Sequence, residues 1–156
     1  MDVVKLLLFL HVMGAILAFG PTFAYSIMGA MAGREPQHAN FSARQVEAIG
    51  NKLVYPLAIF QGITGVLLIL AANIDLKAAV WLGLGIVLYA IALTYALTIQ
   101  RAALHHLIEL SSTPPAPGTQ PSPEIPATVG KIQRGGMFLG LLIVVIVFLM
   151  VTKPTL

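Results

Sequence analysis

Four stretches of the sequence contain no aspartate, glutamate, lysine or arginine: residues 6–33, 53–74, 78–100 and 135–152. Each stretch is 18 to 28 residues long and consists mostly of apolar residues. A helix needs about 20 apolar residues to cross the hydrocarbon core of a bilayer. The apolar residues are continuous and do not alternate with polar ones, which excludes a transmembrane β-barrel. The sequence therefore predicts an all-α integral membrane protein, a bundle of four transmembrane helices in a lipid bilayer.

The shortage of charge also excludes several classes of protein. Only 10% of the 156 residues are charged, whereas a soluble domain carries about 25%. This excludes an ordinary soluble enzyme. The chain has no cysteine, which excludes a disulfide scaffold and a thiolate metal site. The net charge of +3 is small and scattered, so nucleic acid is not expected as a partner.

We expect one membrane domain over residues 1–156, with transmembrane helices at about 4–32, 53–74, 78–104 and 134–152. The first apolar stretch is much longer than the core of a signal peptide, so we interpret it as a retained helix. Ser42 and Gln45 have the spacing of a capping box, which predicts a short amphipathic helix from about residue 43 into the second span. Prolines are frequent between residues 111 and 130, which predicts a flexible loop there.

The positions of the basic residues predict how the chain lies in the membrane. Six of the nine fall in the segments between the first and second spans and between the third and fourth, and three lie on the other side. Because Lys and Arg accumulate in cytoplasmic loops, we expect a multi-pass protein of the bacterial inner membrane with both termini in the periplasm. The six are Arg34, Arg44, Lys52, Arg101, Lys131 and Arg134, and the three are Lys5, Lys77 and Lys153.

His11 is the histidine that falls inside a predicted span. A neutral imidazole is a frequent metal ligand and an axial ligand of haem. One hypothesis is therefore a b-type haem or porphyrin held by His11, with Met150 as a second ligand at a similar depth. In the alternative, the imidazole forms hydrogen bonds inside the bundle, as polar groups within membranes generally do. The sequence leaves both open, and the identity of any cofactor or metal stays unknown.

His105, His106 and Glu109 follow the third span. His105 and Glu109 are four residues apart on a helix and could share a metal, but the sequence offers no third ligand within reach. We therefore interpret this segment as the amphipathic end of the third helix, lying at the membrane surface.

Two pairs of glycines have the spacing of helix-packing motifs. Gly29 and Gly33 lie in the first span, and Gly136 and Gly140 in the fourth. Small residues four apart allow helix backbones to approach closely in lipid. The sequence thus predicts two packing faces, although glycines are also simply common in membrane helices.

Two stretches carry a resemblance to a known family. The first begins at Lys5 with KLLLFLHVMGAIL, and the second begins at Lys52 with KLVYPLAIFQGITG. They resemble the first and second helices of bacterial integral membrane proteins of the domain-of-unknown-function 2269 family. The resemblance extends over the four helices and implies no established activity.

A more distant resemblance is to the small membrane protoporphyrinogen oxidases and to copper-resistance-type membrane proteins. It rests on the Leu-His-Val start, on the second helix with its proline and glycines, and on a lysine before a third helix that Trp81 leads. In the oxidases, a histidine of the first helix and a lysine of the third are implicated in function. His11 matches the histidine, whereas Lys77 precedes Trp81 and falls at the membrane edge.

These observations favour a protein without catalytic residues. The middle of the spans contains no Asp, Glu, Lys or Arg, and proton-driven transporters usually need such groups there. Our first hypothesis is an accessory or structural subunit of a larger respiratory or photosynthetic membrane assembly, with other membrane subunits or further copies of itself as partners. The alternative is a haem- or porphyrin-binding redox protein in electron transport, with His11 as the ligand. A transporter of small solutes or metal ions comes third.

Overall fold

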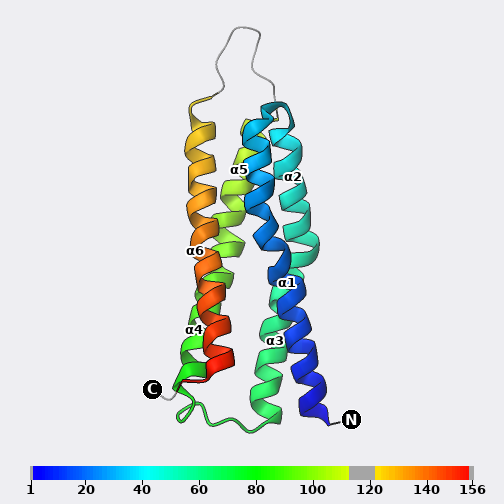
Figure 1. The fold of residues 1–156 in the computed structure, drawn as a ribbon, viewed down its shortest axis with the longest axis vertical. Helices are drawn as coiled ribbons and strands as arrows, with labels where there is room; N and C mark the ends of the chain where they lie inside the picture. Colours follow the sequence, from blue (N-terminus) through cyan, green and yellow to red (C-terminus); the bar gives the residue numbers. More distant parts are fainter. Residues whose placement is uncertain (1, 113–121, 155–156) are drawn as a thin grey trace.

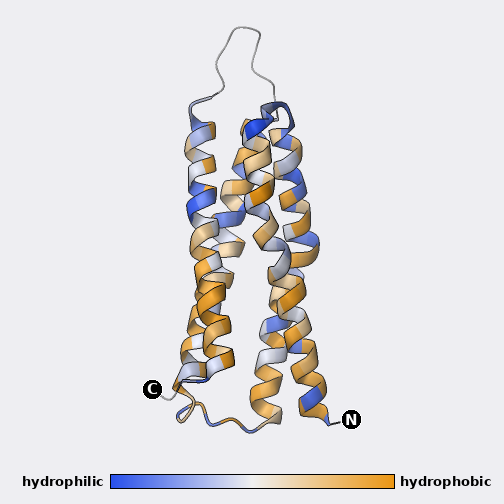
Figure 2. Ribbon diagram, viewed as in Figure 1, coloured by the Kyte–Doolittle hydropathy of each residue, from blue (hydrophilic) through white to orange (hydrophobic). Residues whose placement is uncertain are grey.

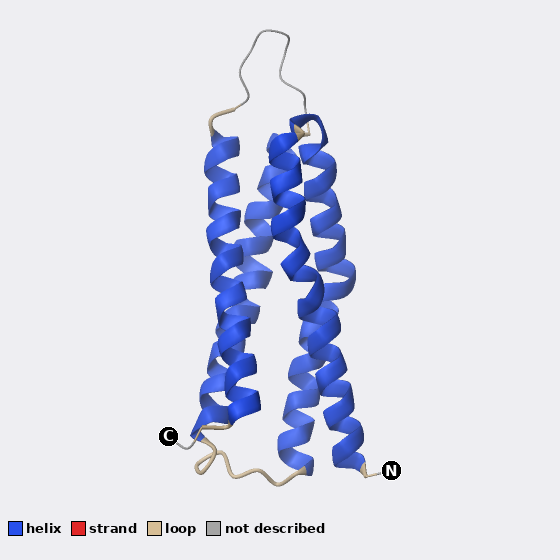
Figure 3. Cartoon of the chain, in the orientation of Figure 1, coloured by secondary structure: helices blue, strands red, loops and turns tan. Residues whose placement is uncertain are grey.

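The computed structural model describes residues 2–112 and 122–154, and all of its regular structure is helical (Figures 1 and 3). Four of its helical stretches are long and apolar enough to cross a membrane: Val3–Arg34, Pro36–Ala71, Val80–Leu110 and Glu124–Thr152. The prediction of an all-α, four-helix membrane bundle is thus confirmed. The elements in chain order are α1 (Val3–Arg34), η1 (Pro36–His38), α2 (Ala39–Ile49), η2 (Gly50–Val54), α3 (Tyr55–Ala71), α4 (Val80–Tyr95), η3 (Ala96–Gln100), α5 (Arg101–Leu110) and α6 (Glu124–Thr152).

The second and third spans are each composed of two helices joined by a π-helical turn. η2 joins the amphipathic α2 to the apolar α3, and η3 joins the apolar α4 to the amphipathic α5. A π-helical turn contains about one residue more than an α-helical turn. Each π-turn lies close to the point where an apolar stretch changes to a more polar one. Figure 2 shows this as a change from orange to mixed blue and orange.

The start of the second helical stretch differs from the expected capping box. The helix begins at Ala39, directly after the 3₁₀ turn that starts at Pro36, and the capping residue His38 makes no side-chain hydrogen bond there. Ser42 lies inside α2, and its hydroxyl donates to the carbonyl oxygen of Met28 at 3.4 Å. The capping-box prediction was wrong because proline, which favours the first turn of a helix, starts the helical turns upstream.

The last helix begins earlier than residue 134. α6 starts at Glu124, so the end of the segment expected to be a proline-rich loop, 111–130, is helical. Residues 113–121 of that segment lie outside the described residues. At the opposite end, the connection between α3 and α4 contains Asn73 with a left-handed φ of 50°. In the same connection the Asp75 carboxylate accepts a hydrogen bond from the Lys77 amide at 2.9 Å.

The spans are arranged as two helix pairs. α1 packs most extensively on α3, and α4 packs on α6 (Figure 1). α3 and α4 follow one another in the chain but make few close contacts, whereas α2 packs on α5 at the opposite end of the bundle. Both described termini lie at the α3–α4 connection end. About half of the large apolar side chains are exposed, as expected for helices surrounded by hydrocarbon.

Candidate functional site: a hydrogen-bonded histidine between two spans

His11 lies in α1 and faces α3. Its Nδ1 atom is 3.1 Å from the hydroxyl oxygen of Thr64, and its Nε2 atom is 3.0 Å from the amide nitrogen of Gln61. Gln61 and Thr64 are three residues apart in α3, so their side chains lie on the same helix face. Both are buried. The structure thus places one imidazole between two polar side chains inside an apolar span.

The orientation of the Gln61 amide sets where the proton of the imidazole lies. In the orientation that the structure gives it, the amide nitrogen donates to Nε2 of His11, and the proton of the imidazole then resides on Nδ1. Nδ1 then donates to Thr64, and the Thr64 hydroxyl donates to the carbonyl oxygen of Phe60 at 3.0 Å. A neutral imidazole satisfies the whole chain of hydrogen bonds without placing a charge in the membrane.

Two glycines make room for this site. A Cβ atom at Gly14 would lie 2.8 Å from the Gln61 carbonyl oxygen Oε1, and one at Gly65 would lie 3.1 Å from Cε1 of His11. Larger residues would separate α1 from α3. Oε1 of Gln61 is itself buried and has no hydrogen-bond partner among the described residues.

The second residue of the haem hypothesis, Met150, lies in a different environment. Its Cε atom would be 2.5 Å from a Cβ atom at Gly85, so Met150 packs α6 against α4. His11 makes its polar contacts with α3. Iron could bind His11 only by replacing Gln61 or Thr64 at one nitrogen. Ligation of haem by His11 and Met150 stays a prediction. Among the described residues, no three His, Asp or Glu side chains are placed so that they could hold one metal ion.

This arrangement fits a membrane-embedded chain with a polar helix contact, and a comparison with known families gives the same class. The family model described as "Predicted integral membrane protein (DUF2269)" matches residues 5–154. The chain belongs to this family. No curated protein and no solved structure matches it. The resemblance to DUF2269 proteins is confirmed, while a bacterial origin and the more distant resemblances stay predictions.

A second group of polar side chains in this DUF2269 protein lies at the α2–α5 end. His105 contacts Glu47 through Nδ1 at 3.1 Å and Glu109 through Nε2 at 3.4 Å. His106 is 3.9 Å from Glu109 through Nδ1 and 3.6 Å from Glu124 through Nε2. We call these five residues the histidine–carboxylate chain. The expected proximity of His105 and Glu109 holds, and the structure adds Glu47 from α2 and Glu124 from α6.

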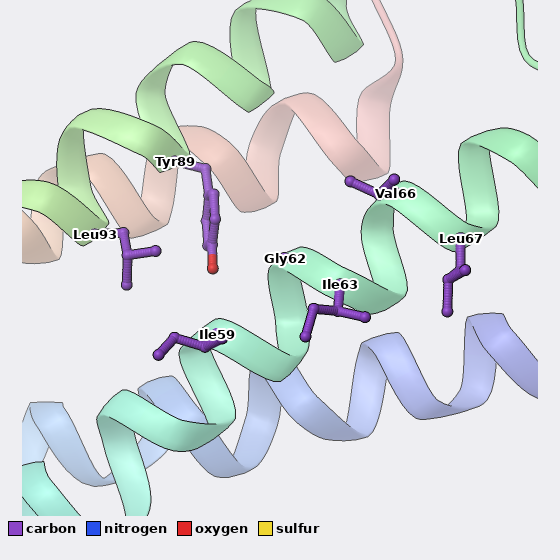
Figure 4. Close-up of a pocket in the computed structure, with 7 residues that line it drawn as sticks. All are labelled: Ile59, Gly62, Ile63, Val66, Leu67, Tyr89 and Leu93. Atoms are coloured by element: carbon purple, nitrogen blue, oxygen red, sulfur yellow. The ribbon is translucent and has the colours of Figure 1, made fainter.

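A groove of ≈ 390 Å³ separates α3 from α4 on the side where the two helix pairs diverge. Figure 4 shows Tyr89 reaching across it from α4 toward α3. The Tyr89 hydroxyl donates to the carbonyl oxygen of Ala58, and a Cβ atom at Gly62 would lie 3.0 Å from that hydroxyl. Tyr89 therefore links two helices that otherwise pack loosely. The lining residues are Ile59, Gly62, Ile63, Val66, Leu67, Tyr89 and Leu93.

Sequence reasoning identified His11 but missed both of its partners. Gln61 is a carboxamide in the middle of a charge-free stretch, and Thr64 follows it by three residues. That pair was the available signal, because strongly polar side chains inside a span generally face another helix.

Proposed function

We propose that this protein is a non-enzymatic accessory or structural subunit of a membrane assembly, and that it binds other transmembrane helices through two glycine faces. The first face contains Gly29 and Gly33 of α1, and the second contains Gly136 and Gly140 of α6. The observation that carries the proposal is the open space beside these glycines. A Cβ atom added at any of the four would have no neighbour within 4 Å outside its own helix in the described part of the chain.

Glycines elsewhere in the chain support this interpretation. Gly14, Gly62, Gly65 and Gly85 lie against side chains of neighbouring helices, so the internal helix contacts use glycines at other positions. Both pairs with the four-residue spacing therefore remain accessible from outside. Such pairs associate helices in lipid by allowing their backbones to approach closely. A helix of another subunit or of a second copy would fit either face.

The test is to extract the protein from its native membrane in lipid particles and to measure the mass of its complexes by native mass spectrometry. We expect complexes with other membrane subunits or with further copies. Replacing both glycines of either pair by leucine should reduce complex formation several-fold, because leucine prevents close helix approach. The two double variants are Gly29→Leu/Gly33→Leu and Gly136→Leu/Gly140→Leu. The matched control is Gly83→Leu, since Gly83 also has open space beside it but belongs to neither pair. A wild-type protein recovered only as an isolated monomer would contradict the proposal.

We further propose that the α2–α5 end faces the cytoplasm and that both termini face the periplasm of a bacterial inner membrane. The support is the excess of Lys and Arg in the segments at the α2–α5 end. The chain has no cysteine, so single cysteines report their side of the membrane without background. Ala48→Cys should be protected from an impermeant thiol reagent in intact cells, and Leu76→Cys should be labelled. The reverse pattern would refute this orientation.

A further inference from the structure

The histidine–carboxylate chain connects three helices of the two pairs. Glu47 belongs to α2, which continues into α3, whereas His105, His106 and Glu109 belong to α5, which continues from α4. Glu124 lies in the first turn of α6. The contact between His105 and Glu47 thus joins one helix pair to the other, and the contact between His106 and Glu124 joins α5 to α6.

Each histidine in this chain has a carboxylate oxygen beside both of its ring nitrogens. His105 lies between Glu47 and Glu109, and His106 lies between Glu109 and Glu124. A neutral imidazole has one N–H group and can donate to only one of two acceptors, while its other nitrogen carries a lone pair that the second carboxylate repels. An imidazolium has two N–H groups, one toward each carboxylate. The His105–Glu47 contact is a hydrogen bond, and the other three contacts, at 3.4 to 3.9 Å, are ion pairs when the histidines are protonated. Protonation of the two histidines would therefore turn all four contacts into attractive ion pairs.

Protonation of the two histidines also changes the net charge of the histidine–carboxylate chain. With neutral histidines, three carboxylates lie along the chain and repel one another, whereas two protonated histidines leave a net charge of −1. Arg101, one helical turn before His105, lines the same ≈ 490 Å³ pocket as Glu47 and His105, and its guanidinium lies 6.0 Å from the Tyr55 ring centre. Asn40 holds α2 near α5 independently of protonation, because its side-chain amide donates to the Ile108 carbonyl and the Ser111 hydroxyl, both at 3.0 Å.

We propose that the histidine–carboxylate chain is a proton-operated clasp that closes α2 onto α5 and α6 when His105 and His106 are protonated. Histidine is the side chain that ordinarily changes charge between about pH 5 and 8. Acidification at this membrane surface would therefore draw the two helix pairs together at this end. Deprotonation would loosen the contact, while the Asn40 hydrogen bonds keep α2 and α5 adjacent.

The clasp can be tested by double electron–electron resonance on the full chain in lipid nanodiscs. Spin labels are attached to Ala48→Cys in α2 and Ala127→Cys in α6, two exposed positions in a chain that lacks cysteine. We expect the short-distance population to be about threefold larger at about pH 5.5 than at about pH 8, a size consistent with exposed ion pairs. His105→Gln should remove most of this response, because glutamine stays polar but does not titrate.

The matched control is His38→Gln. His38 is also exposed and has a carboxylate neighbour, Glu35 at 3.9 Å, but that neighbour lies three residues away in the same connecting segment. This variant should retain the full response. Identical distance distributions at the two pH values would overturn the proposal. So would an undiminished response in His105→Gln, or its loss in His38→Gln.

Discussion

The two helix pairs are held together by different kinds of contact. Between α1 and α3, His11 forms hydrogen bonds with Gln61 and Thr64 next to two glycines. Between α4 and α6, the contacts in the span are mainly van der Waals contacts. The Met150 side chain lies on Gly85, and the rings of Tyr95 and Phe138 pack edge to face with their centres 5.1 Å apart. Lipid is as apolar as a protein core, so neither pair gains from burying apolar surface. In the apolar part of the bundle, α1 and α3 are thus joined by hydrogen bonds to an imidazole, whereas α4 and α6 are joined by close packing. The hydrogen bond on the second side, from the Gln100 amide of η3 to the Ile132 carbonyl at 3.0 Å, lies beyond α4.

This difference predicts different responses to substitution. Hydrogen bonds to an imidazole are directional and fix how far α1 can slide or rotate along α3. Apolar packing tolerates replacement by side chains of similar volume. We therefore expect the α1–α3 pair to be the more sensitive of the two.

The largest effect should come from Gly14→Leu. The new side chain would collide with Gln61 and with Phe60, whose ring would be 3.3 Å from the added Cβ atom, and would separate His11 from its partners. Overpacking and broken buried hydrogen bonds together should lower the free energy of unfolding by about 3 kcal/mol. Titration with a denaturing detergent, followed by circular dichroism, measures this. Gly20→Leu in the same helix enters open space, and an equal loss there would contradict the explanation.

A smaller effect is expected for His11→Leu, about 1–2 kcal/mol, because it leaves the Gln61 amide without its partner inside the membrane, whereas the Thr64 hydroxyl keeps the Phe60 carbonyl. Gln61→Leu should cost a similar amount. The double variant should lose about 1 kcal/mol less than the sum of the two, since neither the His11 ring nor the Gln61 amide is then left opposite an apolar partner. Strictly additive losses would show that the two side chains do not interact.

The variant Met150→Leu tests both the packing of α6 on α4 and the haem hypothesis. If Met150 only packs on Gly85, leucine of similar volume should cost about 1 kcal/mol or less and leave the absorption spectrum of the purified protein unchanged. If His11 and Met150 hold a haem, the wild-type protein has a Soret band, which Met150→Leu shifts and His11→Leu removes. The spectrum therefore distinguishes packing from ligation.

The smallest effect should follow from Lys153→Gln. The Lys153 ammonium lies 5.9 Å from the centre of the Trp81 ring and connects the end of α6 to the start of α4. An exposed cation–π contact contributes about 0.5 kcal/mol. The loss should disappear when Lys153→Gln is made in a Trp81→Leu background, and an unchanged loss would assign the role of Lys153 to other contacts.

The fold could be predicted because the positions of the charges can be read from the sequence without knowing which helices are neighbours. Continuous apolar stretches must become helices in lipid, whatever their neighbours are. The rotation of each helix about its axis is not local. Gly29 and Gly33 have the expected packing spacing but face away from the other described helices, whereas the isolated Gly14 faces Gln61.

The candidate site was only partly predictable for the same reason. His11 was conspicuous as a titratable side chain in a span, but Gln61 is 50 residues away in sequence and becomes its partner only when α1 and α3 face each other. Glu47 and His105 are separated by 58 residues. Their contact depends on how α2 and α5 are rotated toward each other, which the charge pattern alone does not specify.

The two π-turns have a consequence for how the chain could vary in length. One residue inserted into a regular α-helix would rotate everything beyond it by about 100°, whereas the wider π-turn absorbs the extra residue within one turn. Deleting one residue from η2 or η3 would therefore restore α-helical geometry and leave α2 or α5 facing nearly the same way. Each of these spans can thus change its length by one residue at the π-turn while both of its parts keep their neighbours.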